Sequence, residues 1–314
     1  MERTKLFPMV QFKKDTWEID EFDCASIFLL VGTEKAMVID AGMGIGDLRG
    51  AIEMITDKPI ICVISHGHVD HTGNARQFDE IWINEKDAAA PIPQSTARRK
   101  WDIERIARRQ KGCIGAPFTM YNLYPYDIDD DLSPEVEGPV PNLHYMTDGM
   151  QFDLGGGRIV TAYDCPGHSP GEMVFLDEQT RTLFSGDALN FNLGVSAIPV
   201  ETTLRYLKRV QAMSDKYDGI WNGHHDFRAL GAPLDDDCLE NAIALMEEAV
   251  AGNINICETP SFWGQSVPLK KGVRTNDQTN APKARADEGP KGNRVTLRKG
   301  RNFLGIDPDL IHEK

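Results

Sequence analysis

The side chains best suited to chemistry gather first in the stretch ISHGHVDHTGN, Ile64 to Asn74. It holds three of the chain's eight histidines and one aspartate, directly after an apolar run. Titratable side chains are costly to bury without partners, so a hydrophobic core gives no reason for this cluster. Neutral imidazole nitrogens and a carboxylate oxygen are ligands that suit Zn²⁺, with Fe and Mn as competitors. The stretch therefore predicts a metal site.

The spacing within this stretch points its side chains in two directions. In an extended segment, residues two apart point to the same side, so His66 and His68 can reach one ion together. Asp70 and His71 come where the chain is expected to turn into a helix, and they can face a second ion beside the first. The cluster alone thus has room for two neighbouring ions.

Three later clusters offer more ligands of the same kinds. His168 lies in DCPGHSPGE, Asp187 in LFSGDALN, and the pair His224 and His225 in WNGHHD. Each cluster follows a predicted strand, and strand ends are where proteins that combine strands with helices build their sites. Four motifs that lie far apart in the sequence could therefore meet in one place.

The segments between the motifs have the patterns of strands and helices. Residues 27–31 and 36–40 flank a short glycine-containing turn, which predicts a hairpin, and residues 42–55 have the spacing of an amphipathic helix. Residues 60–64 are continuously apolar and predict a buried strand that ends at the first histidine cluster. Further strands are predicted at 80–84, 157–163, 172–177, 182–187 and 219–223, and further helices at 202–213 and 234–252.

Two segments depart from this pattern. Residues 89–142 are rich in charges and aromatic side chains and end in several prolines, which predicts a helical and aromatic insertion that covers the site. Residues 270–314 hold 11 Lys and Arg against 6 Asp and Glu and are predicted to be a basic, irregular C-terminal extension. We therefore expect a catalytic domain over residues 1–269 and this extension over residues 270–314.

The composition limits the class of protein. Hydrophobic residues make up 41% and charged residues 26%, as in soluble globular proteins, and no run approaches the ~20 apolar residues of a membrane span. The start of the chain has no apolar stretch of a secretory signal, and the six cysteines form no C-x-x-C pair, so we expect a cytoplasmic protein with reduced thiols. The net charge of −14 disfavours nucleic acid. The expected partner is a small-molecule substrate, without membrane or nucleic acid, and a homo-oligomer is compatible with the sequence.

The motifs H-x-H-x-D-H, P-G-H-S-P-G, S-G-D and G-H occur in this order over roughly residues 20–250. They resemble those of the metallo-β-lactamase-fold hydrolases, above all the glyoxalase II and lactonase branches. The resemblance implies an α+β fold, a four-layer αββα sandwich, and two divalent metal ions, with Zn²⁺ expected. The ligands it implies are His66, His68 and His168 for one ion, Asp70, His71 and His224 for the other, and Asp187 as the bridge between them.

The resemblance also implies an activity. Two ions that share a hydroxide would cleave an ester, a thioester or a lactone, with Asp70 or a metal-bound water protonating the leaving group. Asp40 lies in the glycine-rich stretch DAGMGIGD, which lacks the Lys-Ser/Thr of a phosphate-binding loop, so Asp40 is expected to support the histidine loop from behind. His225 is expected to contact ligands rather than to bind an ion.

The substrate is less closely defined. The lactonase branch usually has a tyrosine just after the bridging aspartate, where this chain has Asn190. Asn190 and three tyrosines of the insertion, Tyr121, Tyr124 and Tyr126, are therefore the candidate substrate contacts. An alternative comes from the persulfide dioxygenases, which resemble glyoxalase II but are oxidoreductases with a single Fe²⁺. The identity and number of the metal ions distinguish the two functions.

Overall fold

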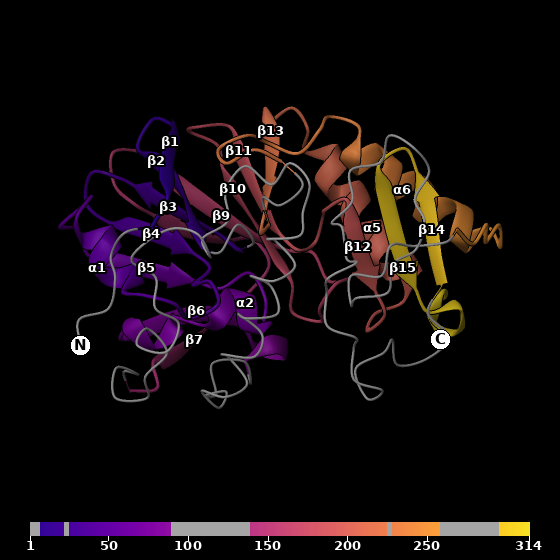
Figure 1. Ribbon diagram of the computed structural model, residues 1–314, viewed down its shortest axis with the longest axis horizontal. Helices are drawn as coiled ribbons and strands as arrows, with labels where there is room; N and C mark the ends of the chain where they lie inside the picture. Colours follow the sequence, from indigo (N-terminus) through magenta and orange to yellow (C-terminus); the bar gives the residue numbers. More distant parts are fainter. Residues whose placement is uncertain (1–6, 22–24, 89–138, 225–227, 258–294) are drawn as a thin grey trace, which may run out of the picture.

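The protein is described by a computed structural model that covers residues 7–21, 25–88, 139–224, 228–257 and 295–314. Two large β-sheets pack face to face, helices lie on their outer faces, and a third, small sheet stands beside the last helices (Figure 1). The predicted α+β fold, an αββα sandwich, is confirmed. Within the described ranges, none of the helices combines the length and apolar character needed to cross a membrane.

The first sheet has seven strands that neighbour one another in sequence order. They are β1 (Met9–Lys13), β2 (Thr16–Glu21), β3 (Ala25–Val31), β4 (Ala36–Ile39), β5 (Ile60–Val63), β6 (Glu80–Asn84) and β7 (Asn142–Met146). The first four strands pair antiparallel, and β3 with β4 forms the predicted hairpin. From β4 onward the strands are parallel, so crossover connections join them. Those connections carry the helices α1 (Leu48–Glu53) and α2 (Val69–Thr72) and the 3₁₀ turns η1 (Ala75–Gln77) and η2 (Glu85–Asp87).

The second sheet has five strands in the order β13-β11-β10-β9-β8. They are β8 (Met150–Asp153), β9 (Ile159–Asp164), β10 (Met173–Asp177), β11 (Thr182–Gly186) and β13 (Gly219–Asn222). All neighbours pair antiparallel except β11 and β13, which are parallel. Because β11 and β13 run in the same direction, the loops that follow them leave the sheet at the same edge.

The alternation of side chains along β3 shows how the layers are held together. Phe28 faces the second sheet, where its ring lies 4.7 Å from that of Phe184, while Ile27 faces the opposite way with Leu48 and Ile52 of α1. Successive residues of a strand point to opposite faces, so a continuous apolar run buries both sides of the sheet. The outer face of the second sheet is covered by α5 (Val200–Ala212) and α6 (Cys238–Val250).

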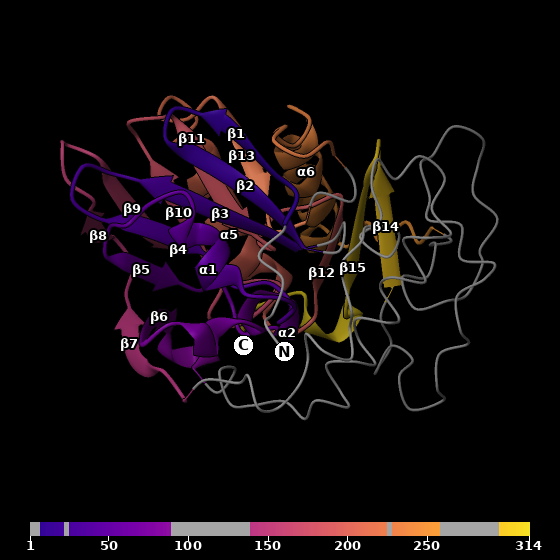
Figure 2. The same cartoon turned by 60° about the vertical axis from the view of Figure 1, so that its left-hand side comes forward.

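The end of the chain is more regular than the sequence predicted. Residues 270–314 were expected to be irregular, but β14 (Val295–Lys299) and β15 (Asn302–Ile306) form an antiparallel hairpin, and β15 pairs in parallel with β12 (Asn192–Val195). Leu297, Leu304 and Ile306 are buried in the same core as α6. The prediction missed these apolar residues because Arg298, Lys299 and Arg301 lie between Leu297 and Leu304 and make the segment basic. Figure 2 shows this hairpin beside β12.

Two predicted segments lie wholly or largely outside the described residues. Of the insertion at 89–142, residues 89–138 fall in an undescribed range, and Asn142 already belongs to β7. Residues 258–294 are also outside the description, so the division of the chain at residues 269 and 270 stays a prediction.

We predict that Leu304→Ala lowers the free energy of unfolding by about 2–5 kcal/mol, because a fully buried leucine loses its apolar contacts and leaves a cavity. Urea unfolding of the two proteins measures the difference. The matched control is Thr296→Ala on β14, whose partly exposed side chain is expected to change stability by no more than about 0.5 kcal/mol. Equal stability of parent and Leu304→Ala would contradict the packing of the hairpin.

Candidate metal centre

All seven predicted ligands lie where chain segments leave the two facing sheets. The first four follow β5 and enter α2, one lies in the loop between β9 and β10, one follows β11, and one follows β13. In that order they are His66, His68, Asp70 and His71, then His168, Asp187 and His224. The parallel pairing of β11 with β13 explains why the last two ligands are neighbours in space.

Three histidines form the first group. The Nδ1 atom of His68 lies 3.0 Å from Nε2 of His66 and 2.9 Å from Nε2 of His168. Burial lowers the pKa of His66 well below its usual value, and burial lowers the pKa of His168 to about 4 although Asp187 opposes the shift. Both rings are therefore neutral near pH 7. Three nitrogens that converge in this way are a suitable donor set for one ion.

Asp70, His71 and His224 form the second group, and each offers one atom within 4.8 Å of the others. Asp187 lies between the two groups. Its Oδ2 atom is 3.2 Å from Nε2 of His224 and 3.5 Å from Nε2 of His168. The structure thus brings the seven residues close together, and it also places His66, His71 and Asp187 within 4.8 Å of one another, so the two groups adjoin at the aspartate. The role of the seven residues as metal ligands stays a prediction.

Two buried atoms at this centre show that the residues fit a bound cation. Among the described residues, neither Nε2 of His71 nor Oδ1 of Asp187 has a hydrogen-bond partner. A buried polar atom without a partner costs free energy, and a divalent ion is a partner that both a ring nitrogen and a carboxylate oxygen accept. The donor set fits divalent metal ions.

The charges of the centre also agree with a cation. Burial raises the pKa of Asp187, but His224 and His71 outweigh it and hold that pKa well below its usual value. The pKa of Asp70 is likewise lowered, because His71 and His224 outweigh the effect of burial. Burial lowers the pKa of His71, yet Asp40 and Asp70 raise it to about 9. Both carboxylates are ionised near neutral pH, whereas His71 must lose a proton before its free nitrogen can bind an ion.

Asp40 makes the contacts expected of it. Its carboxylate accepts hydrogen bonds from the backbone N–H of Ser65 at 2.7 Å and from the hydroxyl of Ser65 at 2.8 Å, and it lies 2.9 Å from Nδ1 of His71. A carboxylate on the far nitrogen fixes the orientation of a ligand histidine. Asp40 adopts a φ of +67°, which is uncommon for a residue other than glycine.

The backbone N–H groups of the glycine-rich stretch after Asp40 donate hydrogen bonds to a side chain of the protein itself. The buried carboxylate of Glu21 accepts the N–H groups of Met43, Gly44 and Ile45, with distances of 3.2 Å for Gly44 and 2.8 Å for Ile45. These are the donors that a phosphate group would need, so the structure agrees with the argument against a phosphate loop. Glu21 was not predicted, because nothing in its own strand signals a contact with residues so distant in sequence.

Glu172 is a second residue that the sequence analysis missed. Its buried carboxylate accepts the backbone N–H of Asp187 at 2.9 Å and lies 3.4 Å from Nδ1 of His66. Burial and the charge of Asp187 raise its pKa well above the usual value. The available signal was a glutamate directly before the mostly apolar strand β10. Glu172 contacts one member of the first group and the shared aspartate.

Arg228 holds the strand end that precedes His224. Its buried guanidinium pairs with Glu18 at 2.7 Å and donates to the carbonyl of Asn222 at 3.0 Å. The backbone carbonyl of Gly223 accepts the N–H of Ser26 on β3 at 2.8 Å. The end of β13 is thereby fixed against the first sheet, and with it the backbone that carries His224.

The remaining predicted site residues have different outcomes. Asn190 is buried and its Oδ1 atom accepts the backbone N–H of Asn192 at 2.7 Å, so its side chain helps to form a turn. Tyr121, Tyr124, Tyr126 and His225 lie outside the described residues. Their roles stay predictions.

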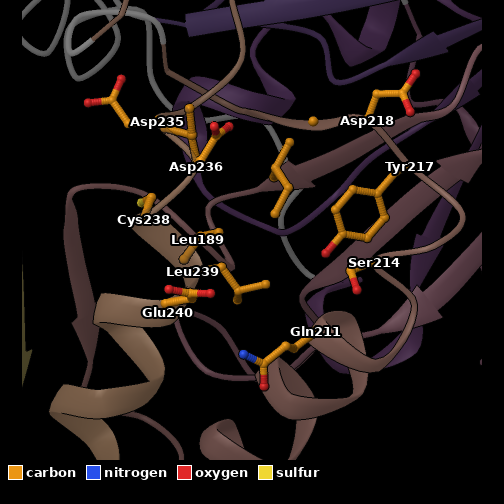
Figure 3. A pocket seen from close by; sticks show the side chains of 13 residues that line it. Leu189, Gln211, Ser214, Tyr217, Asp218, Asp235, Asp236, Cys238, Leu239 and Glu240 are labelled. Atoms are coloured by element: carbon orange, nitrogen blue, oxygen red, sulfur yellow. The ribbon is translucent and has the colours of Figure 1, made fainter.

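A cavity of about 210 Å³ lies apart from the seven ligands. It is formed near the start of β13 and of α6, and none of the seven residues lines it. Figure 3 shows Tyr217, Cys238 and the acidic side chains Asp218, Asp235 and Asp236 around it. The cavity therefore contributes no ligand to the candidate metal centre.

Comparisons with known proteins agree with this geometry. Residues 22–228 match the model of the metallo-beta-lactamase superfamily, and the chain belongs to that superfamily. It is 26% identical over 209 residues to the acyl-coenzyme A thioesterase MBLAC2 of Homo sapiens, an alignment that covers 62% of this chain and 68% of the relative. It is 24% identical over 165 residues to the hydroxyacylglutathione hydrolase GloC of Haemophilus influenzae, which covers 50% of this chain and 62% of that protein.

A solved structure supports the fold. The metallo-beta-lactamase from Pontibacter korlensis aligns with a TM-score of 0.51 at 17% identity and covers 77% of this chain and 99% of its own. The region matched by the superfamily model ends at residue 228, so α6 and the hairpin of β14 and β15 lie beyond it.

We predict that His224→Ala lowers the metal content from about two ions per chain to about one, because His224 belongs only to the second group. Elemental analysis of protein purified without chelator measures the content. The matched control is His144→Ala, since His144 stacks on Trp82 and belongs to neither group. Equal metal content in His224→Ala and the parent would contradict the assignment of this ligand.

Proposed function

We propose that this protein is a metal-dependent hydrolase that cleaves thioesters of small acyl-carrying molecules with the help of two divalent ions, most simply Zn²⁺. The observation that carries the proposal is the position of Asp187 between two adjoining groups of three candidate ligands, with His66 and His71 also within 4.8 Å of it. His66, His68 and His168 would hold one ion, and Asp70, His71 and His224 the other. When bound, such ions lower the pKa of water toward neutrality and polarise a carbonyl group.

The protein's own residues would hold the ligand side chains in the positions that this chemistry needs. Asp187 is ionised and touches both groups, so it would set the distance between the two ions. Asp40 and Glu172 lie against the far nitrogens of His71 and His66 and would fix the directions in which these rings present their free nitrogens. Because these supports are buried, the ligands would need little rearrangement on binding.

Two arguments favour a thioester over the ester and the lactone that the sequence left open. The two relatives named above are an acyl-coenzyme A thioesterase and a hydroxyacylglutathione hydrolase, and both names describe acyl groups carried on a thiol. The leaving thiol has a pKa of about 8.5, so it can depart as a thiolate and has little need of a residue that protonates it. The lowered pKa of Asp70 suits a ligand better than a proton donor.

The competing function is that of an oxidoreductase with a single iron. The second group of ligands is as complete as the first, which supports two ions and a hydrolase. One iron per chain, with thiol-dependent uptake of oxygen, would overturn the proposal.

We predict that the zinc-loaded protein hydrolyses acyl-coenzyme A or acylglutathione faster than a matched oxygen ester, a lactone or a phosphodiester. Asp187→Ala should reduce kcat/KM roughly a thousandfold or more, because it removes the residue that both groups share. Release of the free thiol measures the rate, and His144→Ala serves as the control that retains it. A folded Asp187→Ala protein with both ions and parental turnover would contradict the role of the aspartate.

A further inference from the structure

Asp87 is a buried aspartate that ends the 3₁₀ turn η2 after β6, and neither group of candidate ligands includes it. Its carboxylate accepts three hydrogen bonds. The Oδ2 atom accepts the backbone N–H of Gly67 at 3.0 Å and the hydroxyl of Ser169 at 2.5 Å, and Oδ1 accepts the backbone N–H of Gly171 at 3.0 Å. One side chain therefore uses both of its oxygens on loop residues.

These three donors belong to the two loops that carry the first group of histidines. Gly67 lies between His66 and His68, and Ser169 directly follows His168. The loops are about a hundred residues apart in sequence, since the contact between His68 and His168 spans a separation of 100. Asp87 thus joins the loops at the place where their histidine nitrogens converge.

The fit between Asp87 and the second loop is close. A Cβ atom added to Gly171 would lie 2.8 Å from Cγ of Asp87 and 3.0 Å from its Cβ and backbone nitrogen. Contacts under 3.0 Å are too short for real side chains, so the backbone of this loop rests directly on the carboxylate. This contact explains the second glycine of P-G-H-S-P-G, Gly171.

We propose that Asp87 is a positioning residue for the first metal ion: it holds the two histidine loops at the separation that His66, His68 and His168 need to bind one ion. This role rests on the proposed metal centre. Its effect should be confined to the first ion, because Asp40 holds His71 and the backbone bridge from Ala25 holds His224. Loss of a residue that orients ligands typically weakens metal binding about 10–100-fold.

The substitution that tests this role is Asp87→Asn. The amide keeps the shape of the side chain but replaces one acceptor oxygen with an NH₂ group, which cannot accept the N–H of Gly67 or Gly171. The matched control is Asp79→Asn, directly before β6. The side chain of Asp79 is 86% exposed, and its carboxylate pairs with Arg49.

Each substitution is made in two backgrounds that isolate the ions. His224→Ala removes a ligand of the second group and leaves the first ion to be measured, and His168→Ala does the reverse. Zinc affinity is measured by competition with a chromophoric chelator, and circular dichroism checks folding. We expect Asp87→Asn to weaken zinc binding about 10–100-fold in the His224→Ala background and to leave it unchanged in the His168→Ala background. Asp79→Asn should change neither affinity.

Other outcomes overturn the role. Unchanged zinc affinity in the His224→Ala background, or equal weakening in both backgrounds, means that Asp87 does not position the first ion. If Asp87→Asn does not fold, the same comparison is made with Ser169→Ala, which removes one of the three hydrogen bonds. This variant should lower the zinc affinity only in the His224→Ala background. If neither background binds zinc before Asp87 is changed, the metal centre itself is wrong and the role falls with it.

Discussion

The constraint on which the structure depends is the close approach of seven titratable side chains, of which His66, His71 and Asp187 are buried while His68 is exposed. Each of the seven has a ring nitrogen or a carboxylate oxygen within 4 Å of such an atom of another member, and two of the buried atoms lack a hydrogen-bond partner among the described residues. Such a cluster is unfavourable in a protein interior unless a cation is bound or other groups compensate its charges. The fold supplies much of that compensation from behind the ligands.

Buried carboxylates from other elements fix the ligand loops. Each accepts backbone or side-chain donors in or beside a loop that carries ligands, and none of them belongs to a ligand group. They are Asp40 behind the first cluster, Asp87 between the histidine loops, Glu172 behind Asp187, and Glu18, which acts through Arg228 on the end of β13. A carboxylate can accept several N–H groups at once, so it fixes a loop that has no sheet or helix of its own to order it. The candidate ligands are thus held in place by the protein's own hydrogen bonds.

The sequence was sufficient to select seven residues that the structure brings together and to predict about half of the strands. Residues two apart in an extended segment share a side, so His66 and His68 could be paired from spacing alone, and apolar runs such as that of β5 predict buried strands. The grouping of His168 and His224 with them came from resemblance, because local spacing does not show which strand ends meet. That meeting depends on the parallel pairing of β11 with β13.

The residues that support the ligands could not be predicted in the same way. Asp87 lies in the polar run NEKD, which has the composition of a surface turn, and its contacts with Gly67 and Gly171 are 20 and 84 residues away. The C-terminal hairpin was missed for a related reason, since the basic residues at and beside the turn lie between its buried Leu297 and Leu304. Burial of a charged residue is decided by tertiary contacts, which composition and periodicity do not contain.

The most direct measurement is anomalous diffraction at the zinc absorption edge from crystals of the zinc-loaded protein. Two peaks about 3.5–4 Å apart are expected, with Asp187 between them. One should adjoin Nε2 of His66 and the other Nε2 of His71. A single peak, or peaks away from these nitrogens, would contradict the dinuclear centre.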